Sequence, residues 1–215
     1  MRPIRLRRSP LLPNRVVSNF RVRGYIVRMA ALAETRIRLA TEADVPALRE
    51  LIDASVRGLQ TEDYSPTQID HALQTVFGVD SQLIADGTYF LAEPRAKDSG
   101  ELVIAGCGGW SRRKKLHGGD AWTEQRKELL DPAVDAAKIR AFFISPAFAR
   151  MGVGTRILQA CEAAAIAAGF RRLEMSATLT GVKLFSARGY VEIERMVLDI
   201  GSGETLPVMR MEKRV

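Results

Sequence analysis

Two glycines stand where an apolar run gives way to a helical pattern, and their position suggests an anion site. Ile139 to Ile144 is apolar apart from Arg140, as expected for a strand covered on both faces. Gly152 and Gly154 then open a helix, whose first N–H groups lack internal partners and carry partial positive charge. A loop without Cβ atoms lets a phosphate or pyrophosphate approach these groups closely. Packing of the helix against the strand explains the glycines equally well, so both explanations stay open.

The helix is predicted from an apolar stripe and a terminator. Gly169 ends it, because only glycine enters the left-handed conformation without strain. The stripe consists of Val153, Ile157, Leu158, Cys161, Ala164, Ala165 and Ala168. The sequence has no G-x-x-x-x-G-K-[ST] motif, and the third glycine of the dinucleotide fingerprint is missing. These two classes of phosphate site are therefore excluded.

The residues around the glycines resemble the acyl-CoA-binding loop of the GNAT superfamily of N-acetyltransferases. That family has arginine or glutamine, two residues, glycine, one residue, and glycine or alanine before the helix. Residues 149–154 read Ala-Arg-Met-Gly-Val-Gly, so Ala149 takes the arginine or glutamine position and Arg150 follows one place later. Because the loop acts mainly through backbone N–H groups, we expect CoA binding to survive this departure.

A second signature of the family, Asn-x-x-Ala-x-x-Leu-Tyr-x-x-x-Gly-[Phe/Tyr], is matched in its spacing. It falls on Thr178, Gly181, Leu184, Phe185, Gly189 and Tyr190. The opening I-R-x-A-T-x-x-D-x-x-x-L at residues 37–48 is similar to the first strand and helix of the family. With the order of the elements, the resemblance extends over about residues 35–213.

This resemblance implies an α/β fold, in which one domain holds a mixed, twisted sheet of about seven strands flanked by about four helices. It implies that acetyl-CoA is the acyl donor, that the cofactor enters between the central strand and the next, and that no metal takes part. The central strand is expected to pair its backbone with the pantetheine arm. The implied cofactor contacts are Phe142, Phe143, Ile144, Ala149, Arg150, Met151, Gly152, Val153, Gly154, Thr155, Thr178 and Phe185.

The catalytic groups depart from the family pattern. Phe185 replaces the tyrosine that often protonates the departing thiolate, and Thr178 replaces the usual asparagine. The central strand has no carboxylate that could serve as a base. Ser176, as a holder of water, and Asp120 are the candidate catalytic residues. Four further candidate bases, each also explained by a structural role, are His117, Glu124, Asp135 and Glu174.

Two aromatic residues and one insertion are candidates for the acceptor site. Tyr64 lies in a loop that the family layout puts over the acyl site, although packing explains a lone tyrosine better; Trp110 is the second candidate contact. Residues 111–137 form a charged insertion between two strands, and connections of this length are usually functional or mobile. We expect a substrate lid whose basic start meets the adenosine 3′-phosphate or an acidic substrate. A solvated loop is the alternative.

The remaining elements follow from hydrophobic period and from turn residues. Helices are expected after Thr41 or Asp44, from Ser65-Pro66, and over Leu179–Arg188. Predicted strands are Glu34–Ala40, Thr88–Glu93, Leu102–Trp110, Arg172–Ala177, Val191–Ile200 and Leu206–Lys213. Three glycines in one strand, Gly106, Gly108 and Gly109, indicate either a bulge or the close approach of a ligand.

Charge is concentrated at the N-terminus. Residues 1–28 hold eight arginines, no lysine and no acid, so the net charge of +7 leaves −1 for residues 29–215. We expect residues 1–33 to be a disordered extension before a domain over 34–215. A misassigned start with Met29 as the first residue, a mitochondrial presequence, and a tail that binds nucleic acid or membrane are the three explanations. No nucleic-acid partner is expected for the folded domain.

The overall composition is that of an ordinary globular domain, with 47% apolar and 27% charged residues. No apolar run approaches the roughly 20 residues that span a bilayer. Cys107 and Cys161 are expected to be buried free thiols. We therefore expect a cytoplasmic protein without a membrane partner, and a homodimer stays open.

The predicted activity is transfer of an acetyl group from acetyl-CoA to a primary amine of a small molecule or peptide. Phe185 and the missing base favour one alternative, an acyl-CoA-binding module with little or no catalysis. The basic N-terminus favours another, a protein that binds nucleic acid through its tail.

Overall fold

A computed structural model describes residues 35–96, 99–122 and 128–215. The predictions for residues 1–33 and for Glu124 lie outside these ranges. The described strands are β1 (Arg36–Leu39), β2 (Tyr89–Glu93), β3 (Gly106–Ser111), β4 (Ala137–Ile144), β5 (Arg172–Thr178), β6 (Val191–Asp199) and β7 (Thr205–Arg214). The α-helices are α2 (Val45–Leu59), α3 (Pro66–Gln74), α4 (Ser81–Ala85), α5 (Val153–Ala167) and α6 (Leu179–Ser186). Two 3₁₀ turns, η1 (Glu42–Asp44) and η2 (Pro146–Phe148), precede α2 and α5.

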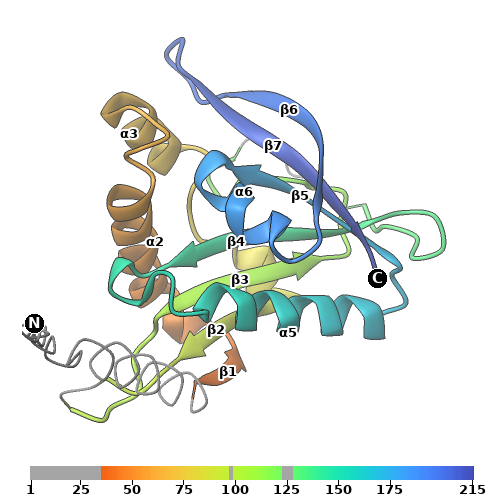
Figure 1. Cartoon of the computed structure of the whole chain (residues 1–215), viewed down its shortest axis with the longest axis horizontal. Helices are drawn as coiled ribbons and strands as arrows, with labels where there is room; N and C mark the ends of the chain where they lie inside the picture. The colour runs from red at the N-terminus through yellow and green to blue at the C-terminus, as the bar shows by residue number, and fades with distance from the viewer. Residues whose placement is uncertain (1–34, 97–98, 123–127) are drawn as a thin grey trace, which may run out of the picture.

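The seven strands form one mixed sheet in the order β1-β2-β3-β4-β5-β7-β6, which confirms the predicted fold class (Figure 1). Every strand pair in the sheet is antiparallel except β4 with β5. The described residues hold five α-helices where about four were expected. The short helix α4 spans only five residues, too few to produce a visible hydrophobic period.

Helices cover both faces of the sheet, and each face has its own core. The helix α5 runs across β2, β3 and β4 on one face, and α2 packs against β4 on the other (Figure 1). The α5 core contains Ile157, Leu158 and Phe185, whereas the α2 core contains Leu48 and Phe143. Both expected thiols are buried and free. None of the helices in the described residues is long and apolar enough to cross a bilayer.

A bulge interrupts the pairing of β3 with β4, and it explains the glycines of β3. The register shifts between Cys107 and Gly109, and Ala141 opposite has a φ of 53°. A Cβ on Gly108 would lie 2.5 Å from the ring of Phe142. One on Gly106 would lie 2.7 Å from Ile144 Cδ1. The structure therefore supports the bulge, packed against the protein's own side chains, and not the close approach of a ligand.

The bulged carbonyl of Ala141 has partners within the core. The hydroxyl of Tyr89 donates to it at 3.3 Å, and the thiol of Cys107 does so at 3.7 Å. Burial raises the pKa of Cys107 to about 12, so the thiol remains protonated and able to donate. These bonds fix the irregular backbone at the point where β4 leaves its neighbour β5.

The parallel strands β4 and β5 pair only at their beginnings. The ladder consists of Ala137 with Leu173 and Lys138 with Glu174. Beyond Lys138, the backbone groups on that side of β4 have no strand partner in the part of the chain that the structure describes, because β5 diverges toward β7. Figure 1 shows the two strands separating with α6 near the gap. An opening of this kind in a sheet needs either side chains or a ligand to satisfy its backbone groups.

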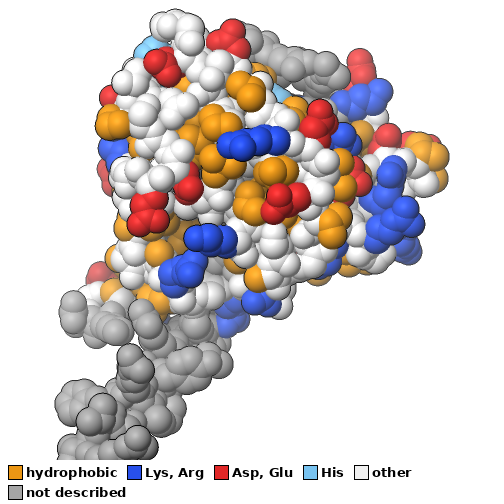
Figure 2. Space-filling model, turned by 45° about the horizontal axis from the view of Figure 1, so that its top comes forward, with side chains coloured by type: hydrophobic (Ala, Val, Ile, Leu, Met, Phe, Trp, Pro, Cys, Tyr) orange, Lys and Arg blue, Asp and Glu red, His pale blue; other side chains and the backbone are white. Residues whose placement is uncertain are grey.

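The described surface has no single dominant sign of charge on the face seen in Figure 2. Basic and acidic side chains are interspersed there, and apolar side chains gather over the middle of that face (Figure 2). This distribution agrees with the near-neutral charge of residues 29–215 in the sequence.

Candidate functional site

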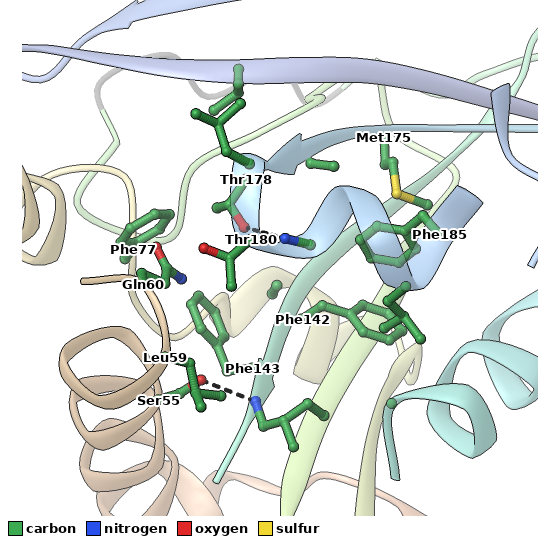
Figure 3. A pocket seen from close by; sticks show the side chains of 18 of the residues that line it. Ser55, Leu59, Gln60, Phe77, Phe142, Phe143, Met175, Thr178, Thr180 and Phe185 are labelled. Carbon is green, nitrogen blue, oxygen red and sulfur yellow. Dashed lines mark hydrogen bonds between the residues drawn. The ribbon is translucent and has the colours of Figure 1, made fainter. Parts of the chain in front are cut away.

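A cavity of about 840 Å³ lies between the separated strands β4 and β5. Two ends of it are distinguished below. The glycine end is formed by residues 148–150, 152–155, 183–185, 187 and 188, with Phe142 and Ile144. The aromatic end is formed by Gln60, Phe77, residues 116–119, Arg140, Phe143, Leu198, Leu206 and Val208. Figure 3 shows Phe142 and Phe185 together on one side, with Phe77, Gln60 and Phe143 on the other.

At the glycine end, each of the two glycines has a separate structural reason. Gly152 is the N-cap of α5 and has a φ of 87°, a left-handed conformation that glycine adopts without strain. A Cβ on Gly154 would lie 3.0 Å from Leu184 Cδ2, so glycine allows α5 to approach α6 closely. The 15-residue helix therefore begins at the cavity wall, with its unpaired N–H groups at the glycine end.

Three cations accompany this helix N-terminus. Arg150, Lys183 and Arg188 are exposed and line the glycine end. Arg150 precedes α5, whereas Lys183 and Arg188 come from α6 and the turn after it. Cationic side chains around a helix N-terminus complement a phosphate group. Sequence reasoning missed Lys183 and Arg188; the available signal was that both lie within the second signature, which spans Thr178 to Tyr190.

Eleven of the twelve residues expected to contact the cofactor line the cavity: Phe142, Phe143, Ile144, Ala149, Arg150, Gly152, Val153, Gly154, Thr155, Thr178 and Phe185. Met151 lies in the same turn but does not line it, and its N–H points to Phe148 O at 3.4 Å. Within the β4 segment, the N–H of Ile144 donates to Ser55 Oγ at 3.1 Å (Figure 3). This N–H is therefore occupied by the protein itself.

Phe185 and Thr178 take the two signature positions that depart from the family pattern. Phe185 is buried, and its ring makes edge contacts with Phe142 at 5.6 Å and with Tyr190 at 5.9 Å. The ring has no proton to give. Thr178 caps α6, since its Oγ accepts from the N–H of Gly181 at 3.2 Å. Threonine thus supplies the N-cap oxygen that an asparagine would supply.

Of the two candidate catalytic residues, Ser176 lines the cavity and Asp120 does not. The Oγ of Ser176 is buried with no hydrogen-bond partner among the described residues. The Oδ1 of Asp120 accepts from the N–H and the hydroxyl of Ser81, both at 2.9 Å, at the start of α4. This carboxylate holds the insertion to α4, so its position supports a structural role.

Neither candidate substrate contact reaches the cavity. The hydroxyl of Tyr64 donates to Pro207 O at 2.8 Å and accepts from Leu179 N at 2.9 Å. Burial raises its pKa to about 12, so the hydroxyl keeps its proton. Trp110 packs edge-on against Phe170 at 6.0 Å in the α5 core. Both residues are buried by packing, which the sequence analysis had favoured as the explanation for Tyr64.

The other candidate bases are also engaged by the protein or lie beside the cavity. Glu174 is buried between Lys138 and Arg210 and pairs with both. Asp135 accepts from the N–H of Asp131 at 2.8 Å. His117 lines the cavity, with its ring 5.1 Å from that of Trp122. Among the described residues, no group of three His, Cys, Asp or Glu side chains could hold a metal ion.

The charged start of the insertion is paired mainly within the protein. Arg113 binds Asp86 at 2.7 Å, and Lys114 binds Glu128 at 3.1 Å. Farther along the insertion, residues 116–119 line the cavity. The described part of the insertion therefore contributes a wall of the site, whereas its role as a lid and its contact with a 3′-phosphate stay predictions.

A buried ion pair holds this wall in place. The guanidinium of Arg140 binds the carboxylate of Asp80, Gly118 O at 2.5 Å and Lys115 O at 3.3 Å. Asp80 in turn caps α4. The N–H of Gly119 donates to Val76 O at 3.0 Å, which joins the insertion to the segment before α4. One arginine from β4 thus gathers two loops at the aromatic end, an arrangement that the sequence did not reveal.

The aromatic end is lined mainly by apolar side chains, together with the amide of Gln60. Phe77 and Phe143 meet edge to face with ring centroids 5.9 Å apart. Leu198, Leu206 and Val208 from β6 and β7 are almost completely buried and line the same end. Gln60 lies beside Phe77 in the cavity wall (Figure 3). Its Oε1 is buried and has no hydrogen-bond partner among the described residues.

Comparison with known proteins adds a family and a set of similar folds. The sequence model of the acetyltransferase (GNAT) family matches residues 45–190. No curated protein matches the chain in sequence. Solved structures do match, with low sequence identity. A GCN5-related N-acetyltransferase from Rhodopseudomonas palustris is 23% identical, with a TM-score of 0.59 over 84% of this chain and 95% of that one.

Two further neighbours were solved with a cofactor. The PaiA N-acetyltransferase of Thermoplasma acidophilum, in complex with coenzyme A, is 13% identical with a TM-score of 0.56, over 85% of this chain and 99% of that one. A protein from Salmonella typhimurium with its cofactor acetyl-CoA is 14% identical with a TM-score of 0.53, over 84% and 94%. At these identities the likeness shows a shared fold, and the family is shown by the sequence model.

Proposed function

The chain belongs to the acetyltransferase (GNAT) family, and on that premise we propose that it transfers the acetyl group of acetyl-CoA to a primary amine. One observation carries the proposal. The cavity between β4 and β5 begins at the N-terminus of α5, where a glycine cap and three cations meet. CoA combines a pyrophosphate with an amide-containing arm, and this end of the cavity offers complementary groups for both.

The cofactor fits the glycine end in two steps. The pyrophosphate would lie against the N–H groups at the start of α5, with Arg150, Lys183 and Arg188 around it. The pantetheine arm would then follow β4, whose backbone on that side has no strand partner beyond Lys138. Because Ser55 already occupies the N–H of Ile144, we expect the arm to pair with groups nearer to Phe142.

The reaction is direct attack of the amine on the thioester. The nitrogen forms a bond to the carbonyl carbon, the C–S bond breaks, and CoA leaves as a thiolate that takes up a proton. An amine with a pKa of about 10.4 must first lose a proton, which costs about 4.6 kcal/mol at pH 7. We propose that Ser176, whose hydroxyl lies in the cavity wall without a partner among the described residues, holds a water that accepts this proton.

Phe185 leaves the departing thiolate without the family's usual proton donor. A thiol with a pKa of about 8.5 is nevertheless a fair leaving group near neutral pH. Alignment of the two reactants in one cavity can contribute roughly 7–11 kcal/mol in well-oriented cases. We therefore propose that positioning of the two reactants supplies most of the rate acceleration. The alternative, a CoA-binding module without turnover, is favoured by the same Phe185.

Two measurements on the full chain separate these possibilities. Titration calorimetry with CoA and with acetyl-CoA tests the cofactor, for which we expect micromolar binding. Release of the CoA thiol from acetyl-CoA in the presence and absence of amines then tests transfer. Binding with thiol release that depends on the amine supports the proposed function. Binding without such release over several amines supports the binding module, and a folded chain that binds neither form of CoA contradicts both.

A further inference from the structure

We propose that the aromatic end binds a primary amine carried on an apolar body the size of an aromatic ring, and that the amine donates to Oε1 of Gln60. This inference rests on the proposed function and names its acceptor class. The aromatic end is the part of the cavity that the proposed CoA site does not occupy, and its shape and chemistry support this acceptor class.

Gln60 supplies the polar contact. The residue is 6% exposed, and its Oε1 has no hydrogen-bond partner among the described residues. Leaving a buried acceptor unpaired costs about 1–3 kcal/mol, so such a group usually meets a ligand donor in the functional state. An amide oxygen accepts hydrogen bonds, and an amine or ammonium supplies them. The residue that lies beside Phe77 in Figure 3 therefore selects a donor.

The walls around Gln60 select an apolar body. Phe77 and Phe143 present two rings, and three buried aliphatic side chains from β6 and β7 complete the lining. A ring buried between such walls is stabilised by the removal of apolar surface from water, at roughly 25 cal/mol per Å². A small amine without a body would leave these walls uncovered, so affinity is expected to follow the size of the apolar group.

The charges near this end favour a cation over an anion. Glu62 and Asp63 are exposed and line the cavity, and Asp63 accepts from the hydroxyl of Thr180 at 2.5 Å. Arg140 is the one permanently cationic side chain among the described residues lining this end. Its guanidinium is bound to Asp80 and to two backbone carbonyls. An ammonium is thus attracted, whereas a carboxylate on the acceptor meets no unpaired cation among the described residues that line this end.

The wild-type protein tests the acceptor class with matched amines. We would measure kcat/KM for 2-phenylethylamine, ethylamine, phenylalanine and spermidine at saturating acetyl-CoA. Ethylamine lacks the ring, and we expect it to be at least about 30-fold poorer, since each buried CH₂ equivalent is worth several-fold. Phenylalanine adds a carboxylate and should be at least about ten-fold poorer. A preference for spermidine or phenylalanine would overturn the proposal.

A substitution tests Gln60 itself. Gln60→Leu removes the amide and keeps a similar volume, so we expect kcat/KM for 2-phenylethylamine to fall about 10- to 100-fold. The midpoint of thermal unfolding should not fall, because an unpaired buried acceptor is replaced by an apolar group. Gln74→Leu, an exposed glutamine at the end of α3 that does not line the cavity, is the matched control. Equal rates in Gln60→Leu and wild type would contradict the assignment.

Binding separates failure of this inference from failure of the proposed function. Calorimetric titration of 2-phenylethylamine into the CoA-bound protein needs no turnover. If CoA and this amine bind and Gln60→Leu weakens only the amine, the acceptor class stands even where no transfer occurs. If CoA binds and other amines are turned over while 2-phenylethylamine neither binds nor reacts, this inference alone fails. If a folded chain does not bind CoA, the proposed function fails at its first step, and titration of the amine into the free protein decides whether this inference fails with it.

Discussion

The two ends of the cavity are built in different ways. The glycine end comes from one continuous stretch, the turn before α5 and the helix itself, with α6 beside it. The aromatic end is assembled from the end of α2, the segment before α4, the insertion, β4 and the strands β6 and β7. The first relies on backbone groups and the second on side chains. A fold can therefore preserve the first end while the second varies in its lining.

The largest expected effect breaks the aromatic end alone. Asp80→Ala removes the partner of Arg140 and leaves an uncompensated guanidinium in the interior. Breaking a buried pair in this way costs about 3–5 kcal/mol, and we expect that loss of unfolding free energy in urea. Because Arg140 also holds residues 115–119, acceptor binding should weaken while affinity for CoA stays within about two-fold of wild type.

An exposed ion pair gives the matched control for this prediction. Asp70 pairs with Arg57 at 2.7 Å, and both side chains are about half exposed. Asp70→Ala should cost under about 1 kcal/mol, as exposed pairs do. The double variant Asp80→Ala, Arg140→Met should recover part of the lost stability. Equal losses in Asp80→Ala and Asp70→Ala would show that the buried pair does not support the aromatic end.

A second change breaks the glycine end alone. Lys183→Glu together with Arg188→Glu puts two carboxylates where we place the pyrophosphate. Each charge-assisted contact is worth about 1.5–3 kcal/mol before solvent screening, so we expect CoA to bind about 100-fold more weakly. Both side chains are exposed, and the fold should be unaffected. Calorimetry with CoA measures the effect.

Two controls accompany this change, a ligand without the pyrophosphate and a charge reversal away from the cavity. Acetyl-pantetheine lacks the pyrophosphate, so its affinity should be the same in the variant and the wild type. Arg49→Glu reverses an exposed charge on α2 away from the cavity and should leave CoA affinity unchanged. A loss of acetyl-pantetheine affinity as large as that of CoA affinity would place the phosphates elsewhere.

Tyr64 does not line the cavity, and its hydroxyl links the first residue of α6 to β7. Tyr64→Phe leaves Leu179 N and Pro207 O without their partner, which should cost about 1–3 kcal/mol of unfolding free energy. The pKa is raised to about 12 in the folded state, above its ordinary value near 10. The wild type should therefore lose stability as pH rises from about 10 to 12, and Tyr64→Phe should lack this component of the loss. An identical pH dependence in both would contradict the raised pKa.

The glycine end could be predicted from the sequence because its residues are adjacent in the chain. A strand, a Gly-x-Gly turn and a helical stripe are local patterns, and the structure places them as one unit from Ile139 to Ala167. The seven-stranded sheet and its mixed order also followed, through the resemblance and the periodicity of single segments. Local rules and the fold agree over this part of the chain.

The aromatic end could not be predicted, since contacts between distant segments decide it. Asp80 and Arg140 are 60 residues apart and each looked like an ordinary charge. Asp120 was predicted as a catalytic candidate from its charge, yet its carboxylate accepts from Ser81 at the start of α4, a helix too short to show a period. Trp110 was expected near the substrate, yet it faces the α5 core. Only the packed fold decides which polar side chain reaches the cavity and which one serves the scaffold.

The smallest expected effect concerns Ser176, a residue of β5 that lines the cavity. Its hydroxyl has no partner among the described residues, so Ser176→Ala should not lower the unfolding free energy. Loss of one hydrogen bond to a water that receives the proton of the amine should lower kcat by about ten-fold or less, with KM unchanged.

Because this water would matter most when the amine is protonated, the deficit in kcat of Ser176→Ala should shrink as pH rises toward the pKa of the amine. Ser176→Thr should restore the rate. Ser186→Ala, at the exposed end of α6, is the control. A deficit that stays constant with pH, or that appears in KM alone, would assign Ser176 to the shape of the cavity and leave proton removal to solvent that enters from the aromatic end.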